Sequence, residues 1–389
     1  MFDRKLFLEA RARVDIDSLV KDLVVRVGTQ FRGQCPLCKA SKAKSPNGQF
    51  AVKIDQKTWR CFACERFGDV VELEQLLGGG TAVEAARRLV GGEVSSASAE
   101  TKAEQPKAPS GPSASDKVAA EMLAEMRPFA GSYAEKYLLG RGIAPEVLMV
   151  IGPQLGFHPN AKWGWDRDAS RWIKAPAMIA PVVVWLDGAA VRTGGVHCTY
   201  LAPRGAGKAA LDPAKRMWGP QQIEGRHGGA ILTPLAVDWP IVAGEGIESS
   251  ASVMTLDWRR SGTMPCAVAA LSLTRLQGGL LRGADGLIDP YDPKPDPARP
   301  PFVIPGPWPL ARIAVDRDMK PIPVRGRTPR GKPCEFLLGS EARARLCARL
   351  ASAAWKAAGA IEARAIAPSP GCDFNDELRR VLAAEKRRA

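Results

Sequence analysis

The strongest constraint on the fold is a repeated pattern in residues 236–389. There a short apolar run precedes a helical pattern four times, and the runs are PIVAG, CAVAAL, ARIAVD and IEARAIAP, beginning at residues 240, 266, 311 and 361. Strands that alternate with helices build a parallel sheet, because each helix carries the chain back to the start of the next strand. The pattern therefore predicts an α/β fold, in which ligands bind at the carboxyl ends of the strands.

Acidic residues follow these strands. Glu245 stands between two glycines after the first run, Asp316 and Asp318 close the third run, and Asp373 and Asp376 lie just before and within the start of the last helical pattern. We expect these acids to gather at one edge of the sheet, where they repel one another unless a divalent cation neutralises them. Hard oxygen ligands suit Mg²⁺ or Mn²⁺, which indicates metal-assisted phosphoryl transfer. Two alternatives stay open, namely solvated loop acids and a helix cap formed by Asp373.

Two CxxC pairs lie near the N-terminus. Cys35 and Cys38 stand in CPLC, and Cys61 and Cys64 stand in CFAC. Each pair can turn both sulfurs towards one point, so that the four thiolates surround one structural Zn²⁺. Two strand-like runs, QFAVKI and TWRCF, lie between and beside the pairs, which predicts an N-terminal β zinc ribbon. Two redox motifs are the disfavoured alternative, because a thioredoxin-type motif would open a helix.

Composition divides the chain. Residues 93–116 are rich in Ala, Ser, Pro and Lys and predict a flexible linker, because they hold too little apolar surface to fold. The linker separates a zinc-ribbon DNA-binding domain, residues 1–92, from a body whose first part spans residues 117–235 and whose second part spans residues 236–389. A Pro-rich stretch, residues 283–309, predicts a long loop within the second part.

The first part of the body predicts a mixture of helix and strand. SDKVAAEMLAEM begins a helix with Ser115 or Asp116 as its N-cap. PVVVWLD and GGVHCTYL form the two strands of a hairpin that turns at Asp187-Gly188.

The charge balance indicates an anionic partner. Lys and Arg exceed Asp and Glu by +14, which favours nucleic acid, although a basic overall composition would give the same sum. In the ribbon, basic residues alternate with Phe50, Trp59 and Phe62, and cations interleaved with aromatic rings are typical of single-strand binding. The rings could instead pack the ribbon core, which we favour for Phe50 and Phe62 and leave open for Trp59. Without a long apolar run or a signal-peptide pattern, we expect a soluble cytoplasmic protein with no membrane partner.

Several motifs together resemble one family. IVAGEGIESSAS, IAVDRD and GCDFNDEL resemble the Toprim domain shared by bacterial-type primases, topoisomerases and some nucleases. YLLGRGIAPEVLMVIGPQLGFHP resembles the segment that opens the RNA-polymerase domain of these primases, and GGVHCTYLAPRGAGKAALDPAKRMWG is similar to the basic N-terminal subdomain of that domain. The ribbon is similar to the primase zinc-binding domain. The order of the parts resembles most the short zinc-ribbon Toprim primases of phages, plasmids and integrated elements.

The resemblance implies roles for single residues. Glu245 matches the Toprim glutamate, a metal ligand or general acid/base, and Asp316 and Asp318 match the metal-binding pair. Asp373 matches the acid of the third metal-binding segment, with Asn375 or Asp376 as its partner. The residues implied to hold template or nucleoside triphosphate are Arg141, Lys208, Lys215 and Arg216.

Three departures from the family pattern stand out. Cys38 replaces a frequent histidine, and a longer insertion, MKPIPVRGRTPRGKPCEFLL, follows Asp318. Ser249 stands where relatives often carry aspartate, so that one metal ligand is missing or is replaced by Glu248.

The resemblance implies a DNA primase that makes short RNA primers on single-stranded DNA by metal-dependent nucleotidyl transfer. GRTPRGKP and APRGAGKA lack the Ser or Thr that a P-loop needs, so we expect the unwinding helicase to be a separate protein. One alternative is a non-catalytic single-stranded DNA-binding or recombination-mediator protein with a degenerate Toprim domain. Another is a Toprim nuclease, whereas a topoisomerase would need an active-site tyrosine on an additional domain.

Overall fold

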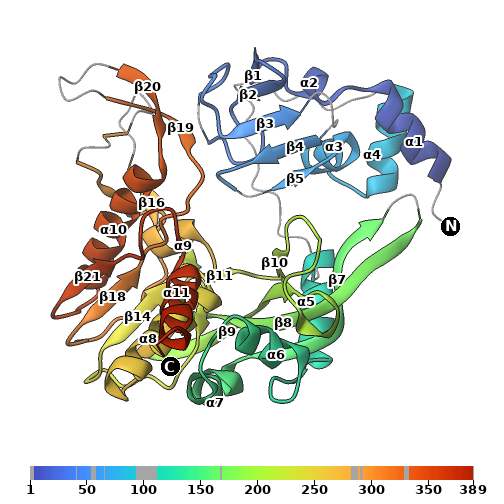
Figure 1. Ribbon diagram of the computed structural model, residues 1–389. Helices are drawn as coiled ribbons and strands as arrows, with labels where there is room; N and C mark the ends of the chain where they lie inside the picture. Colours follow the sequence, from blue (N-terminus) through green and yellow to red (C-terminus); the bar gives the residue numbers. More distant parts are fainter. Residues whose placement is uncertain are drawn as a thin grey trace. The chain divides into compact units, whose positions relative to one another are not determined.

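The computed structural model describes residues 4–388 apart from residues 41, 54–57, 65, 93–111, 167–168, 282–287, 290–291 and 328–332. Contacts divide the chain into two compact units, Met1–Gly111 and Pro112–Ala389, which Figure 1 traces from blue to red. Most of the linker predicted at residues 93–116 lies outside the described residues. Its last residues are helical, because helix α5 (Ala114–Ala124) begins there with Ser113 as its N-cap, not Ser115 or Asp116 as predicted. Asp116 instead completes a capping box with Ser113.

The first unit is a small antiparallel sheet that shares one apolar core with its helices, of which α1, α3 and α4 pack on one another. Its strands run in the order β1-β2-β3-β4-β5. In chain order the elements are α1 (Arg4–Arg13), α2 (Ile16–Leu19), β1 (Val24–Val27), β2 (Gln30–Gly33), β3 (Phe50–Lys53), β4 (Thr58–Cys61), β5 (Phe67–Gly68), α3 (Val70–Gly78) and α4 (Ala82–Gly91). Asp69 caps α3 by accepting hydrogen bonds from the backbone of Val71 and Glu72, which fixes where the sheet ends and the helix begins.

The second unit begins with an antiparallel sheet in the order β10-β9-β8-β7-β6. Its elements after α5 are β6 (Arg127–Pro128), α6 (Tyr133–Gly140), α7 (Pro145–Ile151), β7 (Gly156–Asp166), β8 (Arg171–Leu186), β9 (Ala189–Tyr200) and β10 (Lys215–Trp218). The β8–β9 hairpin turns at Asp187 and Gly188, whose φ values of 48° and 80° suit a tight two-residue turn. The predicted hairpin is confirmed.

A mostly parallel sheet forms the rest of the second unit, in the order β13-β15-β14-β18-β21. Its elements are β13 (Ala230–Ile231), β14 (Ile241–Gly244), α8 (Ile247–Ser261), β15 (Cys266–Ala269), α9 (Leu273–Gln277), β18 (Ala311–Ala314), α10 (Ser340–Ala357), β21 (Ala363–Ile366) and α11 (Phe374–Lys386). All four predicted strand–helix pairs are present and their strands are parallel, whereas the edge strand β13 runs antiparallel to β15. The α/β fold with an N-terminal β-rich unit is confirmed.

Short elements complete this unit. They are the strand pairs β11 (Gln222–Ile223) with β12 (Arg226–His227), β16 (Gly279–Leu280) with β17 (Pro295–Asp296), and β19 (Ile322–Arg327) with β20 (Pro333–Leu338). The last pair is the insertion after Asp318, which folds as a hairpin.

The Pro-rich stretch at residues 283–309 differs from a simple surface loop. Part of it lies outside the described residues, but β17 pairs with β16, and Phe302, Ile304 and Trp308 are buried in the core beside β14 and β18. Apolar residues spaced among prolines lack a helical or strand period, so the sequence pattern did not reveal that they pack inward.

Among the described residues, no helix is both long and apolar enough to cross a membrane.

Candidate active site and zinc centre

The four cysteines of the first unit form one cluster. Their sulfur atoms all lie within 4.8 Å of one another, with Cys35 and Cys64 3.9 Å apart and Cys38 and Cys61 3.6 Å apart. A thiol hydrogen bond from Cys35 and backbone N–H groups after Cys61 lower the pKa of Cys61 to about 5, which favours the thiolate that binds metal. Four thiolates in this arrangement suit tetrahedral zinc, and the predicted zinc site is confirmed.

The aromatic residues of the ribbon are placed differently from the sequence expectation. Trp59 is buried, stacks on Phe50 at 5.4 Å between ring centroids, and donates its indole hydrogen bond to the Asp69 carbonyl. Trp59 is therefore a core residue, and its prediction as a nucleic-acid contact is wrong. Phe62, expected in the core, is 49% exposed and lies beneath the guanidinium groups of Arg32 and Arg60.

In the second unit, acids gather at the carboxyl ends of adjacent strands. Glu245 directly follows β14, and Asp316 follows its parallel neighbour β18 by two residues. Burial raises the pKa of Glu245, and burial together with the charges of Asp373 and Glu245 raises the pKa of Asp316 to about 7. Asp318 is exposed but its charge also reaches Glu245. Partly buried acids that repel one another suit a divalent cation, which is the fit that Mg²⁺ or Mn²⁺ requires.

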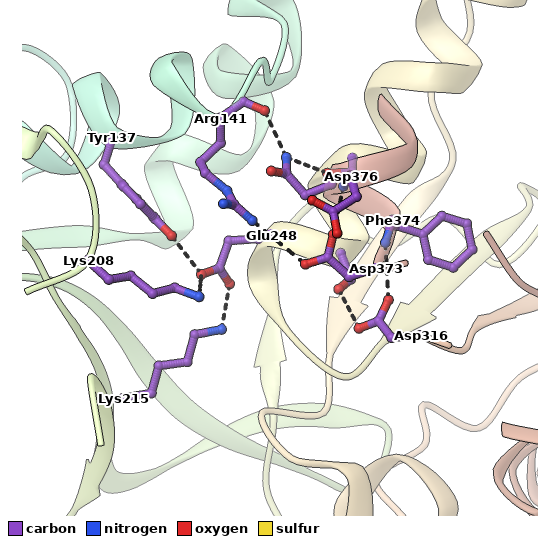
Figure 2. A network of polar contacts seen from close by, with 12 residues as sticks. Tyr137, Arg141, Lys208, Lys215, Glu248, Asp316, Asp373, Phe374 and Asp376 are labelled. Carbon is purple, nitrogen blue, oxygen red and sulfur yellow. Dashed lines mark hydrogen bonds and ion pairs between the residues drawn. The ribbon is translucent and has the colours of Figure 1, made fainter. Parts of the chain in front are cut away.

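Ser249 occupies a central place among these acids. Its hydroxyl donates a hydrogen bond to Asp316 Oδ2 at 2.9 Å. The backbone N–H of Phe374 donates to Asp316 Oδ1 at 3.2 Å (Figure 2). The serine therefore contributes a neutral hydrogen-bond donor beside Asp316 and no charge.

Asp373 caps α11. Its Oδ1 accepts a 2.7 Å hydrogen bond from the backbone of Asp376, while Oδ2 lies 3.7 Å from the guanidinium of Arg141. The helix cap that was one open alternative for Asp373 is therefore present. Its second carboxylate oxygen faces the Arg141 guanidinium. Asn375 is buried, and its amide nitrogen donates to the Arg141 carbonyl and to Ser252, so it holds α11 in place.

Glu248 faces away from the acids. It is buried, and its carboxylate accepts hydrogen bonds from Tyr137 at 3.0 Å and from Lys215 at 2.9 Å, with Lys208 at 3.6 Å (Figure 2). Against the effect of burial, Lys215 and Lys208 hold the pKa of Glu248 far below its usual range. The suggestion that Glu248 replaces the missing metal ligand is wrong, because both of its oxygens are engaged by the lysines and the tyrosine.

The basic residues predicted to bind nucleotide or DNA separate into two groups. Arg141, Lys208 and Lys215 lie beside the acids, where burial lowers the pKa of Lys208, and where Glu248 outweighs burial to raise the pKa of Lys215. Arg216 lies elsewhere, with its guanidinium over the rings of Trp163 and Trp218.

Sequence reasoning missed two features of this site. Tyr137 gives no sequence signal for its role, because its partner Glu248 is 111 residues away in the chain. For Glu248 a signal did exist in the sequence. It directly precedes Ser249 on α8, and side chains of consecutive helical residues point about 100° apart, so Glu248 and Ser249 face different surroundings. Among the described residues, only the four cysteines bring three or more potential metal ligands within 4.8 Å of one another, so the acids form a looser group.

Comparison with known proteins agrees with the zinc centre. Residues 3–105 match the family model of the CHC2 zinc finger, a zinc ribbon of primases. The match is confined to the first unit, which it shows to be a zinc ribbon of the primase type. Residues 113–227 match a domain of unknown function, DUF7146. Among curated proteins none matches the chain.

One solved structure similar to this chain is the crystal structure of the Aquifex aeolicus primase, comprising its zinc-binding and RNA polymerase domains. The alignment covers 98% of this chain and 84% of the other, at 13% identity and a TM-score of 0.35.

Proposed function

We propose that the chain is a DNA primase that joins ribonucleotides on a single-stranded DNA template. The observation that carries the proposal is the pairing of Glu245 and Asp316 at neighbouring parallel strand ends, with Lys208 and Lys215 beside them. Acids at such a sheet edge suit a divalent cation, and lysines suit the phosphates of a nucleoside triphosphate. The primase-type zinc ribbon of the first unit supports the same function.

In this scheme the parallel sheet is a Toprim domain. Asp316, Asp318 and Asp373 would hold one or two Mg²⁺ or Mn²⁺ ions, with Asp376 near the third segment. When bound, such an ion lowers the pKa of a primer 3′-hydroxyl and neutralises charge on the phosphates. Lys208 and Lys215 bind the triphosphate, and Glu245 accepts the proton of the attacking hydroxyl. The 3′-oxygen forms a bond to the α-phosphorus, and the bond to the bridging oxygen breaks to release pyrophosphate.

The test is primer synthesis on unpaired DNA templates of varied sequence with labelled nucleoside triphosphates and Mg²⁺. We expect short RNA products that Glu245→Ala and Asp316→Ala abolish, with a loss of at least about 100-fold. Asp238→Ala is the matched control, because this exposed acid lies before the amino end of β14, the strand whose other end carries Glu245. Synthesis that survives Glu245→Ala would contradict the proposed site.

A second candidate function rests on Ser249. A neutral serine that hydrogen-bonds Asp316 is what a non-catalytic, single-stranded DNA-binding relative with a degenerate site would contain. In that case the protein would bind DNA and give no product on any template, and DNA cleavage without synthesis would instead indicate a Toprim nuclease.

A primase would act on DNA in the cytoplasm and would depend on a separate helicase to expose its template.

A further inference from the structure

Four tryptophans form a continuous strip on the antiparallel sheet of the second unit. The rings of Trp165 and Trp172 meet edge to face at 5.7 Å between centroids, and those of Trp172 and Trp218 at 6.0 Å. Trp163 joins through Arg216, whose guanidinium lies over both Trp163 and Trp218 at 5.2 and 5.1 Å. We call these four residues the tryptophan strip.

The strip begins at the core and ends in solvent. Helix α5 covers one end of this face with Val118 and Met122, and Trp163, Trp172 and Trp218 pack at the margin of that core. Trp165 lies beyond it, directly opposite Trp172 across the β7–β8 ladder, and is 52% exposed. Packing accounts for the three inner rings, but an exposed tryptophan at the outer end buries too little surface to be explained in the same way.

Hydrogen bonds fix the inner rings. The Trp163 indole donates to the Pro213 carbonyl at 2.9 Å, and the Trp218 indole donates to the Tyr200 hydroxyl at 2.9 Å. Arg216 also donates to the Trp163 carbonyl, so its guanidinium is held between the two rings. The inner rings Trp163 and Trp218 are therefore held in place before any ligand arrives, which lowers the entropy cost of binding beside them.

Cations line the strip. The Lys162 ammonium lies 5.2 Å from the centre of the Trp172 ring and is paired with Glu121. Lys174 is directly opposite Lys162 in the ladder, lies two residues from Trp172 on the same face of β8, and is exposed. Lys174 is thus placed to meet a polyanion that runs along the outer end of the strip.

We propose that the tryptophan strip binds an unpaired nucleic-acid strand by stacking a base on Trp165, while Lys174 contacts its phosphates. Aromatic faces beside cations provide sequence-tolerant affinity for single strands, and the net charge of +14 complements such a ligand. The proposal rests on the proposed function for the identity of the strand, which would be the template. It assigns to the β7–β8 hairpin a contact separate from the acids at the parallel sheet.

The test measures binding of the full chain to a labelled oligothymidine of about 12 nucleotides and to an abasic strand of the same length. The two ligands carry equal charge and differ in bases. We expect Trp165→Ala to weaken oligothymidine binding roughly tenfold and to leave the abasic strand unaffected, with an unchanged salt dependence. Trp165→Phe should retain most of the affinity, because it keeps an aromatic face.

Trp239→Ala is the matched control, since this tryptophan is 44% exposed before β14 and donates its indole hydrogen bond to the Met264 carbonyl. Equal binding of both strands by the unmodified chain would overturn the proposal. An equal loss of affinity for both strands in Trp165→Ala would also overturn it, because it would indicate disturbed folding. An unchanged affinity for both strands would overturn it as well and would indicate that the strip contacts a protein partner. Glu245→Ala separates the two proposals, because it should abolish synthesis and preserve base-dependent binding.

Discussion

At the scale of single residues, the adjacent residues Glu248 and Ser249 of α8 contact groups of opposite charge. Glu248 neutralises Lys208 and Lys215, whereas Ser249 donates a hydrogen bond to Asp316. A buried carboxylate facing two lysines is stable only while all three remain, because each desolvated charge needs its partners. Glu248 is thus a positioning residue, which holds the two lysines where the proposed triphosphate would lie.

Glu248→Gln should weaken both folding and nucleotide binding. The amide keeps the size of the side chain but removes its charge, so Lys215 loses the carboxylate that fixes it, and we expect about 2–3 kcal/mol lower unfolding free energy. In primer synthesis the KM for nucleoside triphosphates should rise more than kcat falls, because the lysines bind phosphate and do not transfer protons. Glu385→Gln, which removes an exposed partner of Arg259, is the control. An unchanged KM would show that Glu248 stabilises the fold alone.

His197 predicts a dependence of stability on pH. It is buried, and burial lowers its pKa from 6.5 to about 3. Below pH 6.5 the His197 imidazole is therefore protonated in the unfolded chain but stays neutral in the folded chain. The unfolding free energy should fall as pH drops below 6.5, by up to ~1.4 kcal/mol per pH unit. The charged groups that face His197 are Lys215, Glu248, Arg275 and Lys208.

His197→Gln should flatten this decline, because glutamine does not titrate. The measurement is the midpoint of denaturant unfolding at a series of pH values between 5 and 8, with zinc held in excess at each pH. His227→Gln is the comparison, since His227 lies on the short strand β12 and is half-buried. A decline of equal steepness in His197→Gln would assign the effect to other groups.

At the scale of elements, the sequence predicted what has a regular period and missed what does not. Three of the four apolar runs became the largely buried parallel strands β14, β15 and β18, whose Val, Ile and Ala on both faces require cover by helices on either side, whereas the fourth became the more exposed edge strand β21. The N-cap at Ser113 and the exposure of Phe62 were not predicted, because each depends on local geometry that several residues could satisfy equally. Glu245 and Asp316 were found from their positions after strands, whereas the Tyr137–Glu248 contact joins elements that no local pattern connects.

The Pro-rich stretch gives a test at this scale. Trp308 is fully buried and donates its indole hydrogen bond to the Ile304 carbonyl at 2.8 Å. Trp308→Ala should lower the unfolding free energy by about 3–5 kcal/mol, because it leaves a cavity in the core. Trp239→Ala, which removes a half-exposed ring, should cost much less. Denaturant unfolding of both variants measures the difference, and equal small losses would mean that the stretch is a surface loop after all.

At the scale of the whole molecule, the chain joins two units that are stabilised in different ways. The second unit has large cores on both faces of its parallel sheet. The first unit has one small core that includes Cys35 and Cys61, so its zinc site and its apolar core are continuous. Zinc binding and folding are therefore coupled in the first unit, whereas the folding of the second unit does not depend on zinc.

Removal of zinc should unfold the first unit and leave the second folded. Zinc binding to small ribbon folds contributes about 10–16 kcal/mol, which exceeds the net stability of most domains of this size. Cys35→Ser should have the same effect as a chelator, whereas Cys334→Ser should not, because Cys334 lies on β20 outside the cluster. Limited proteolysis should then cut within residues 4–92 and spare residues 112–388, and an intact first unit after complete zinc loss would show that its apolar core is sufficient.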